Sequence, residues 1–171
     1  MKTIILSLCF LLLFVSISFA LNINDPAPAI SLRDSNGDFF YLSDYVGSGK
    51  KENCKGIIIN FFSSTCKPCK NELPVLNSLV DEFEKKEIKV VIIGHKENFD
   101  KFMEMFEGLK VDKPIILSDP YGKTGDKYGV YGLPITVFIG ADGKVKFIIK
   151  GESPEMEKTL REKAGKLIKG K

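Results

Sequence analysis

Hydrophobic residues dominate two stretches of the chain, at 57–62 and 88–93, each with a single polar residue and each bounded by charged or turn-forming residues. Runs of this length, rich in isoleucine and valine, predict strands that are buried on both faces of a sheet. Between them, apolar residues recur every three or four positions, which predicts a helix over 67–85 with one buried face. The residues on that face are Leu73, Leu76, Leu79, Val80 and Phe83.

Weaker patterns on either side complete the predicted fold. Short apolar segments flank Asn36-Gly37 and again Asp142-Gly143, and each arrangement predicts a β-hairpin. The β-α-β-α-β order between them predicts parallel strands, so we expect an α/β fold with a mixed central sheet and helices on both faces. The predicted strands are 30–33, 39–42, 56–62, 88–93, 114–117, 135–139 and 144–149, and the predicted helices are 67–85, 97–109, 124–128 and a last one capped by Ser153 with Pro154 in its first position.

The first twenty residues have the layout of a secretory signal peptide. Lys2 supplies a positive charge, an apolar stretch follows, and Ser18-Phe19-Ala20 has the small residues of a cleavage site. The alternative is an uncleaved membrane anchor, since the apolar stretch approaches the length of a short span. We therefore predict a signal peptide or anchor at 1–20, one domain at 21–171, and a periplasmic or otherwise extracytoplasmic location. No other stretch is apolar enough to attach the protein to a membrane.

Composition narrows the range of partners. Of the 171 residues, 25 are Lys or Arg and 22 are Asp or Glu, and the two signs are interspersed along the chain. A near balance of charge without a basic stripe argues against nucleic acid as a partner. Hydrophobic residues make up 44% of the chain, which is enough for the core of one globular domain.

Two cysteines stand where the first buried strand gives way to the long helix. Cys66 and Cys69 are separated by Lys67 and Pro68. A sulfur at a helix start lies near unpaired N–H groups and the positive end of the helix dipole, and both lower the pKa of a thiol. The arrangement favours a thiol–disulfide redox site whose only redox group is its own disulfide, without a further cofactor.

Cys54 and His95 allow a second interpretation, in which they join the two other cysteines as ligands of a zinc ion. Structural zinc sites usually contain a second pair of closely spaced ligands, and this sequence lacks one. We therefore expect no metal. Cys54 is expected to be a partly covered, inert cysteine, with a regulatory or intermolecular disulfide as the alternative. His95 is expected to be an exposed loop residue.

Further along the chain, Gly132-Leu133-Pro134 stands directly before an apolar strand. Together with the strand–Cys-x-x-Cys–helix unit, it makes the chain resemble the thioredoxin superfamily, and within it the TlpA/ResA-type extracytoplasmic thiol–disulfide oxidoreductases. The resemblance covers roughly residues 22–168. It implies a thioredoxin-like fold with an N-terminal β-hairpin extension, and reduction of protein disulfides.

Several members of that group serve cytochrome c maturation. The resemblance therefore implies an apocytochrome c or a partner oxidoreductase as the substrate. Outside the cytosol, a membrane-located donor of electrons is expected to return the site to its dithiol form.

Chemistry and the resemblance together assign roles around the cysteine pair. Cys66, nearest the helix start, is expected to attack a substrate disulfide, and Cys69 to resolve the mixed disulfide that results. The two residues between them are expected to tune the redox potential and to border the bound substrate. By resemblance, Pro134 is a cis-proline beside the cysteines, and Leu133 presents its backbone to a substrate strand.

Glu72 lies three residues after the second cysteine, where TlpA/ResA-type reductases carry a glutamate. Asn60 lies six residues before the first cysteine, where cytoplasmic thioredoxins place an aspartate. By this resemblance, Glu72 is expected to take the proton of the resolving thiol. The alternative is an exposed carboxylate in the first turns of the helix, favoured only by the helix dipole.

Thr65 stands where many relatives have Trp or Tyr, which leaves the partner specificity open.

A peroxiredoxin-like peroxide reductase is an alternative function, because Ser63 lies three residues before Cys66 as that chemistry requires. The proline of that pattern is absent, however, and neither Arg33 nor Arg161 is well placed in the sequence to activate a thiolate. A disulfide oxidase or isomerase is a further alternative, which differs from a reductase only in redox potential and partner.

Overall fold

A computed structural model describes residues 21–169 of the chain. The signal peptide or anchor predicted at 1–20 lies outside the described residues. Within 21–169, none of the helices combines the length and apolar character that a transmembrane span needs.

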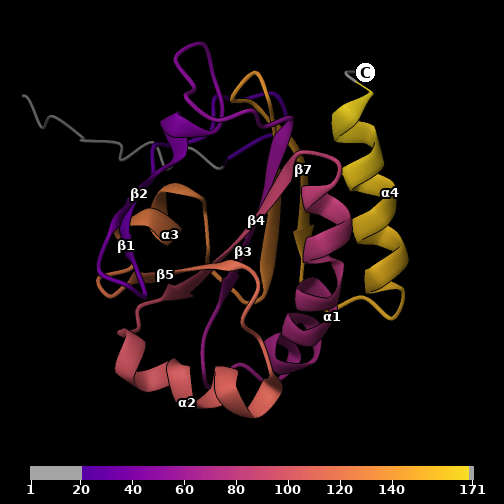
Figure 1. The fold of residues 1–171 in the computed structure, drawn as a ribbon. Coiled ribbons are helices and arrows are strands. Elements are labelled where there is room, and N and C mark those ends of the chain that lie inside the picture. The colour runs from indigo at the N-terminus through magenta and orange to yellow at the C-terminus, as the bar shows by residue number, and fades with distance from the viewer. Residues whose placement is uncertain (1–20, 170–171) are drawn as a thin grey trace, which may run out of the picture.

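The centre of the molecule is a seven-stranded mixed sheet with the strand order β2-β1-β5-β4-β3-β6-β7 (Figure 1). Strands β3, β4 and β5 run parallel, whereas β6 is antiparallel to β3, and β7 to β6. The N-terminal hairpin extends the sheet at the edge opposite β7, because β1 pairs with β5. The strands are β1 (Ser31–Asp34), β2 (Phe39–Tyr41), β3 (Gly56–Phe62), β4 (Ile88–His95), β5 (Ile115–Asp119), β6 (Ile135–Gly140) and β7 (Val145–Lys150).

Helices cover both faces of the sheet. On one face, α1 and α4 lie side by side (Figure 1), and the apolar residues of α1, α2 and α4 pack on the same side of β3. On the other face, α3 and the short 3-10 helix η1 cover a second cluster. All residues of β3 are buried, as expected for a central strand. The helices are η1 (Leu42–Asp44), α1 (Lys67–Glu84), α2 (Phe99–Leu109), α3 (Lys123–Lys127) and α4 (Met156–Ile168).

The predicted class, the mixed sheet, the helices on both faces and the N-terminal hairpin are confirmed. The predicted start of the last helix is wrong. Residues 154–155 form a turn, so the helix begins at Met156 with Glu155 as its N-cap. Ser153 contributes its backbone carbonyl, which accepts a hydrogen bond from Met156 N–H at 3.1 Å. A proline fits the turn as well as it fits a helix start, and the sequence pattern did not separate the two.

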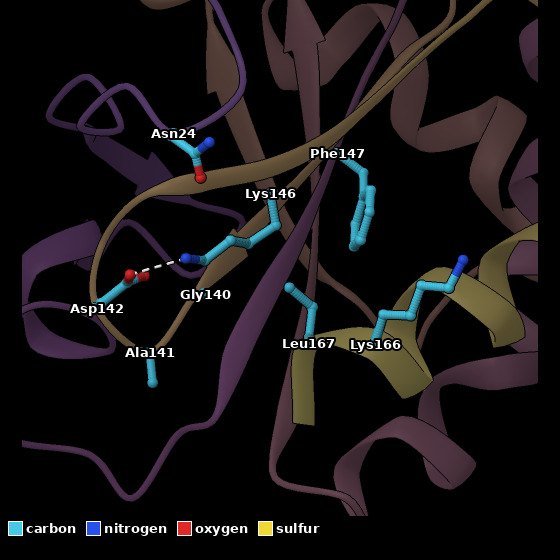
Figure 2. A pocket seen from close by; sticks show the side chains of 8 residues that line it. All are labelled: Asn24, Gly140, Ala141, Asp142, Lys146, Phe147, Lys166 and Leu167. Carbon is cyan, nitrogen blue, oxygen red and sulfur yellow. Dashed lines mark hydrogen bonds and ion pairs between the residues drawn. The ribbon is translucent and has the colours of Figure 1, made fainter. Parts of the chain in front are cut away.

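Figure 2 shows a pocket of about 290 Å³ between the β6–β7 turn and the end of α4. An ion pair of 2.8 Å between Lys146 and Asp142 crosses its rim, and Phe147 and Leu167 supply apolar lining. Because β6 begins near the end of β3 and runs away from it to Gly140, this pocket lies at the end of the sheet opposite the cysteines. The pocket is therefore separate from the site described next.

Candidate active site

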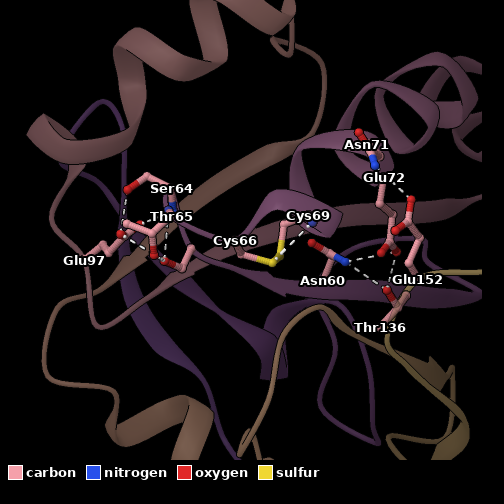
Figure 3. Close-up of a disulfide and its surroundings, with 11 residues drawn as sticks. Asn60, Ser64, Thr65, Cys66, Cys69, Asn71, Glu72, Glu97, Thr136 and Glu152 are labelled. Carbon is pink, nitrogen blue, oxygen red and sulfur yellow. Dashed lines mark hydrogen bonds between the residues drawn. A yellow bond between two sulfur atoms is a disulfide. The ribbon is translucent and has the colours of Figure 1, made fainter.

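Cys66 and Cys69 form a disulfide where the loop after β3 enters α1 (Figure 3). Cys66 is the N-cap of α1, and its sulfur accepts a hydrogen bond from Cys69 N–H at 3.2 Å. Cys66 is partly exposed, whereas Cys69 is fully buried. The helix start thus directs a donor at the sulfur that solvent reaches, and such a donor stabilises a thiolate.

The two residues between the cysteines occupy the first turn of α1. Lys67 begins the helix and is exposed, and Pro68 follows, partly exposed. Proline is tolerated there because the N–H that it lacks would have no helical acceptor. Both side chains border the partly exposed Cys66, on the surface that a substrate would approach. Their role in substrate binding stays a prediction.

A buried polar network lies on one side of the disulfide (Figure 3). Asn60 in β3 and Thr136 in β6 are direct neighbours across the two strands, and both reach Glu72 in α1. The Asn60 amide donates to Glu72 Oε1 at 3.2 Å and to Thr136 Oγ1 at 2.9 Å, and the Thr136 hydroxyl donates to Glu72 Oε1 at 2.8 Å. Glu72 is only 3% exposed, so it is not the surface carboxylate of the alternative interpretation.

Burial raises the pKa of Glu72 to about 7, from an ordinary value of 4.5. The hydrogen bond from Thr136 acts in the opposite direction, and the charge of Glu152 raises the pKa further. Glu152 lies between β7 and α4, where it accepts a hydrogen bond from the Asn71 amide at 2.9 Å. Glu72 Oε2 has no hydrogen-bond partner among the described residues. A carboxyl group with a near-neutral pKa and a free oxygen is suited to accept and release a proton.

The Leu133–Pro134 peptide bond is cis, as the resemblance implied. Because β6 runs antiparallel to β3, Pro134 lies next to the end of β3 that leads to the cysteines. Leu133 and Cys66 border the same hydrophobic cluster. A pocket of about 360 Å³ opens beside them, with Tyr131 and Leu133 in its lining. The structure therefore brings this segment together with the cysteine pair, while its contact with substrate stays a prediction.

Glu97 belongs to the surroundings of the disulfide, although no sequence motif singled it out. It follows β4, is 7% exposed, and accepts hydrogen bonds from Ser63 and Ser64, which precede Cys66. A signal for it exists in the sequence. The carboxyl ends of neighbouring parallel strands meet at one edge of a sheet, so a polar residue just after β4 is expected near the end of β3.

His95 is not the exposed loop residue that was predicted. Strand β4 extends through it because it pairs with Asp119 of β5, and the side chain is 8% exposed, with its Nδ1 3.8 Å from Asp119 Oδ2. Gly125 lies against the ring, since a Cβ at that position would be 2.2 Å from Nδ1. Cys54 is fully rather than partly covered, and its thiol donates to Gly56 O at 3.0 Å.

Within residues 21–169, no three potential metal-binding side chains among His, Cys, Asp and Glu converge on one point. The four residues of the zinc interpretation therefore do not form one cluster.

Residues 23–148 match the family model described as the AhpC/TSA family. The chain belongs to the AhpC/TSA family. A curated relative of this AhpC/TSA protein, thiol–disulfide oxidoreductase ResA from Geobacillus thermodenitrificans (strain NG80-2), is 36% identical over 135 residues, which are 77% of this chain and 71% of the relative. Thiol–disulfide oxidoreductase ResA from Bacillus subtilis (strain 168) is 30% identical over 129 residues, or 75% and 68% of the two chains.

A solved structure assigned as thiol:disulfide interchange protein DsbE from Chlorobium tepidum is also similar. It superimposes with a TM-score of 0.76 at 26% identity, over 87% of this chain and 99% of that one. The names of these relatives and the cysteine pair of this chain indicate the same chemistry. This member of the AhpC/TSA family is a thiol–disulfide oxidoreductase with a thioredoxin-like fold, as predicted, and protein thiols and disulfides are its class of substrate.

Proposed function

We propose that this oxidoreductase reduces disulfide bonds of other proteins outside the cytosol. The observation that carries the proposal is the unequal exposure of the two sulfurs. Cys66 lies at the helix start and is reachable, whereas Cys69 is 0% exposed and shielded from other proteins. One sulfur is thus placed to meet a partner and the other to complete the reaction inside the molecule.

In the reduced protein, the Cys66 thiolate attacks one sulfur of the substrate disulfide. The substrate S–S bond breaks, a Cys66–substrate disulfide forms, and the released substrate sulfur takes a proton. Cys69 then loses its proton and attacks the Cys66 sulfur, so that the mixed disulfide breaks and the Cys66–Cys69 disulfide forms. The second substrate sulfur takes a proton. The substrate gains two electrons and two protons; the protein supplies both electrons and the Cys69 proton, and the second proton comes from solvent, which took the Cys66 proton when the thiolate formed.

Glu72 is the proposed acceptor of the Cys69 proton. It lies one helical turn beyond Cys69, and its pKa of about 7 and its free Oε2 suit that task. The side chains that bind its other oxygen, from Asn60 and Thr136, hold the carboxyl group in place while the proton moves.

Two features support reduction over oxidation. Strong disulfide oxidants stabilise their reduced form, in which the attacking sulfur is a thiolate. Within residues 21–169, one hydrogen-bond donor, Cys69 N–H, reaches the Cys66 sulfur. The nearby ionisable network around Glu72 is acidic, which does not stabilise an anion. We expect a potential well below the value of about −120 mV that marks strong oxidants.

The arginines support disulfide exchange over peroxide reduction. The Arg33 guanidinium lies 4.2 Å from the centre of the Phe39 ring, and Arg161 pairs with Glu157 at 2.9 Å on α4. Both guanidinium groups are thus engaged by other side chains, and no contact of either with Cys66 is present among residues 21–169.

The location rests on the leader sequence at 1–20, and the electron supply follows from the location. Outside the cytosol the Cys66–Cys69 disulfide has to be reduced again after each cycle, and a membrane-located donor fits that need. An apocytochrome c or a partner oxidoreductase is the substrate class to test first.

Trapping with Cys69→Ser tests the proposal. This variant keeps the attacking sulfur but cannot resolve, so we expect it to accumulate covalent complexes with substrates from an extracytoplasmic extract, identified by mass spectrometry. Cys66→Ser is the matched control and should trap nothing and lack exchange activity. Peroxide consumption by the reduced protein that is faster than its reduction of insulin disulfides would overturn the proposal, as would a potential near that of a strong oxidant.

A further inference from the structure

The three residues that connect β3 to the first cysteine, Ser63, Ser64 and Thr65, form a polar loop, here called the Ser-Ser-Thr loop. The carboxylate of Glu97 binds this loop at three points. Its Oε2 accepts from Ser64 N–H at 2.7 Å, and its Oε1 accepts from the Ser64 hydroxyl at 2.7 Å and the Ser63 hydroxyl at 3.1 Å. Figure 3 shows this cluster on the side of the disulfide opposite Glu72.

These bonds also fix the directions of the remaining ones in the loop. A hydroxyl group has one proton, and that of Ser63 is given to Glu97. The contact of 2.9 Å between the Ser63 and Thr65 hydroxyls therefore has Thr65 as its donor, and Thr65 N–H also donates to the Ser63 hydroxyl at 3.3 Å. The three hydroxyls of the loop and the N–H groups of Ser64 and Thr65 are thus oriented by Glu97, directly or through Ser63.

Glu97 is itself held from the neighbouring strand. The Ser118 hydroxyl of β5 donates to the Glu97 carbonyl at 2.8 Å, and Lys96 N–H donates to the Asp119 carbonyl at 2.8 Å. Lys96 has a φ of 60°, a left-handed conformation that is unfavourable for a non-glycine residue and persists only where the surroundings fix it. The chain therefore makes a tight, fixed turn after β4 that places Glu97 under the loop.

The loop in turn sets the position of the first cysteine. Cys66 N–H donates to the Ser63 carbonyl at 3.0 Å, and the Cys66 sulfur faces Cys69 N–H at the start of α1. A shift of Ser63 would carry Cys66 with it and lengthen the contact between its sulfur and the helix. That contact favours the thiolate, which is the attacking species.

We propose that Glu97 is a positioning residue, which clamps the Ser-Ser-Thr loop so that the Cys66 sulfur stays on the first-turn N–H group of α1. The proposal rests on the proposed role of Cys66 as the attacking thiol. In this proposal, Glu97 affects the attack by Cys66 because it fixes the position of the Cys66 sulfur. A carboxylate acting only through its charge would instead disfavour the thiolate.

Two variants separate the clamp from the charge. Glu97→Gln removes the charge but keeps an oxygen for Ser64 N–H and an NH₂ group for the hydroxyls, which can rotate to accept. Glu97→Ala removes both charge and clamp. Glu104→Ala, at an exposed position on α2, controls for the loss of one negative charge elsewhere.

The measurement is the pH dependence of Cys66 alkylation by iodoacetamide in the reduced mature chain, followed by mass spectrometry, together with the rate of insulin reduction. We expect Glu97→Ala to raise the midpoint by about one pH unit and to slow attack about tenfold at neutral pH, since loss of one helix-terminus contact is of that size. The rate of attack by Cys66 in Glu97→Gln should remain within about twofold of the wild-type rate. That rescue is the result expected of a clamp.

Two results would overturn the proposal. One is a lower midpoint in both Glu97 variants, which would mean that the charge matters. The other is an unchanged midpoint in Glu97→Ala with lower thermal stability, which would mean a structural role alone. If Glu97→Ala does not fold, Ser118→Ala loosens the same clamp, and an unchanged midpoint there overturns the proposal equally. Exchange activity in Cys66→Ser would overturn the proposed function instead, independently of the Glu97 variants.

Discussion

Two buried carboxylates flank the disulfide, Glu72 on one side and Glu97 on the other (Figure 3). Both are less than 10% exposed and both accept hydrogen bonds, but the bonds are distributed differently. The Glu97 carboxylate uses both oxygens, and one of its donors is a backbone N–H. The Glu72 carboxylate receives two side-chain donors on Oε1 and none on Oε2 among the described residues.

The difference separates a carboxylate that holds structure from one that can exchange a proton. A backbone N–H can only donate, so the oxygen of Glu97 that it reaches has to remain an acceptor. The partners of Glu72 are a hydroxyl that can rotate and an amide that carries both donor and acceptor groups, so they can adjust to a proton on either oxygen. Similar burial is therefore compatible with the two different proposed roles, according to the donors that each carboxylate meets.

The largest expected effect is on the pH dependence of stability in the oxidised protein. The pKa of Glu72 is raised from 4.5 to about 7, so between these values the folded state holds a proton that the unfolded state has released. The contribution of Glu72 to the free energy of unfolding is fully present below pH 4.5. It falls by about 3 kcal/mol as the pH rises to 7. Denaturant unfolding at pH 4.5 and pH 8 measures the loss. Glu72→Gln should abolish it and Glu97→Gln should retain it; an equal loss in both variants would contradict the comparison.

The next effect concerns the two steps of disulfide exchange. Glu72→Gln cannot accept the Cys69 proton, so resolution of a preformed mixed disulfide should slow about 100-fold at neutral pH, while attack by Cys66 should change little. Rapid-quench analysis of the mixed disulfide separates the steps. The exposed Glu104→Gln serves as the control. Equal slowing of both steps would assign Glu72 a structural role.

A smaller effect is expected from Thr136→Val, which removes the hydroxyl that donates to Glu72 Oε1 at 2.8 Å. That hydrogen bond lowers the pKa of Glu72, so its loss should raise the pKa further, by about one pH unit. The upper end of the pH range in which stability falls should move upward by the same amount. An unchanged range would mean that Asn60 alone controls the carboxyl group.

The smallest effect is expected from Glu152→Gln. The charge of Glu152 raises the pKa of Glu72 from a distance, so removing it should lower that pKa by a few tenths of a pH unit. Because Glu152 is exposed, the difference from the wild type should shrink when the salt concentration rises to 1 M. A difference that does not depend on salt would instead point to the hydrogen bond between Glu152 and Asn71.

Sequence patterns predicted the elements of this fold that are driven by burial. The apolar runs of β3 and β4 and the spaced leucines of α1 are buried as expected, since continuous or periodic hydrophobicity leaves few other solutions. The end of β4 was missed because β5 extends it by pairing. His95 is therefore buried by a partner, Asp119, that is distant in sequence.

The site was predictable to the extent that its chemistry is local. Cys66 and Cys69 are three residues apart and share one helix turn, so their spacing alone suggested their chemistry. The burial of Glu72 depends on Thr136, 64 residues away, and no local pattern contains that contact. Glu97 was missed for the same reason, because it is 33 residues from Ser64 and follows an ordinary strand.

The burial of Cys54 determines how many electrons the domain can carry. Of the cysteines in residues 21–169, Cys54 is the one outside the disulfide, and its thiol is enclosed at 1% exposure. Burial keeps oxidants and foreign thiols from this sulfur while the domain stays folded. The burial of this thiol therefore favours a domain that carries two electrons at a time, with its third cysteine kept from its own disulfide and from other copies.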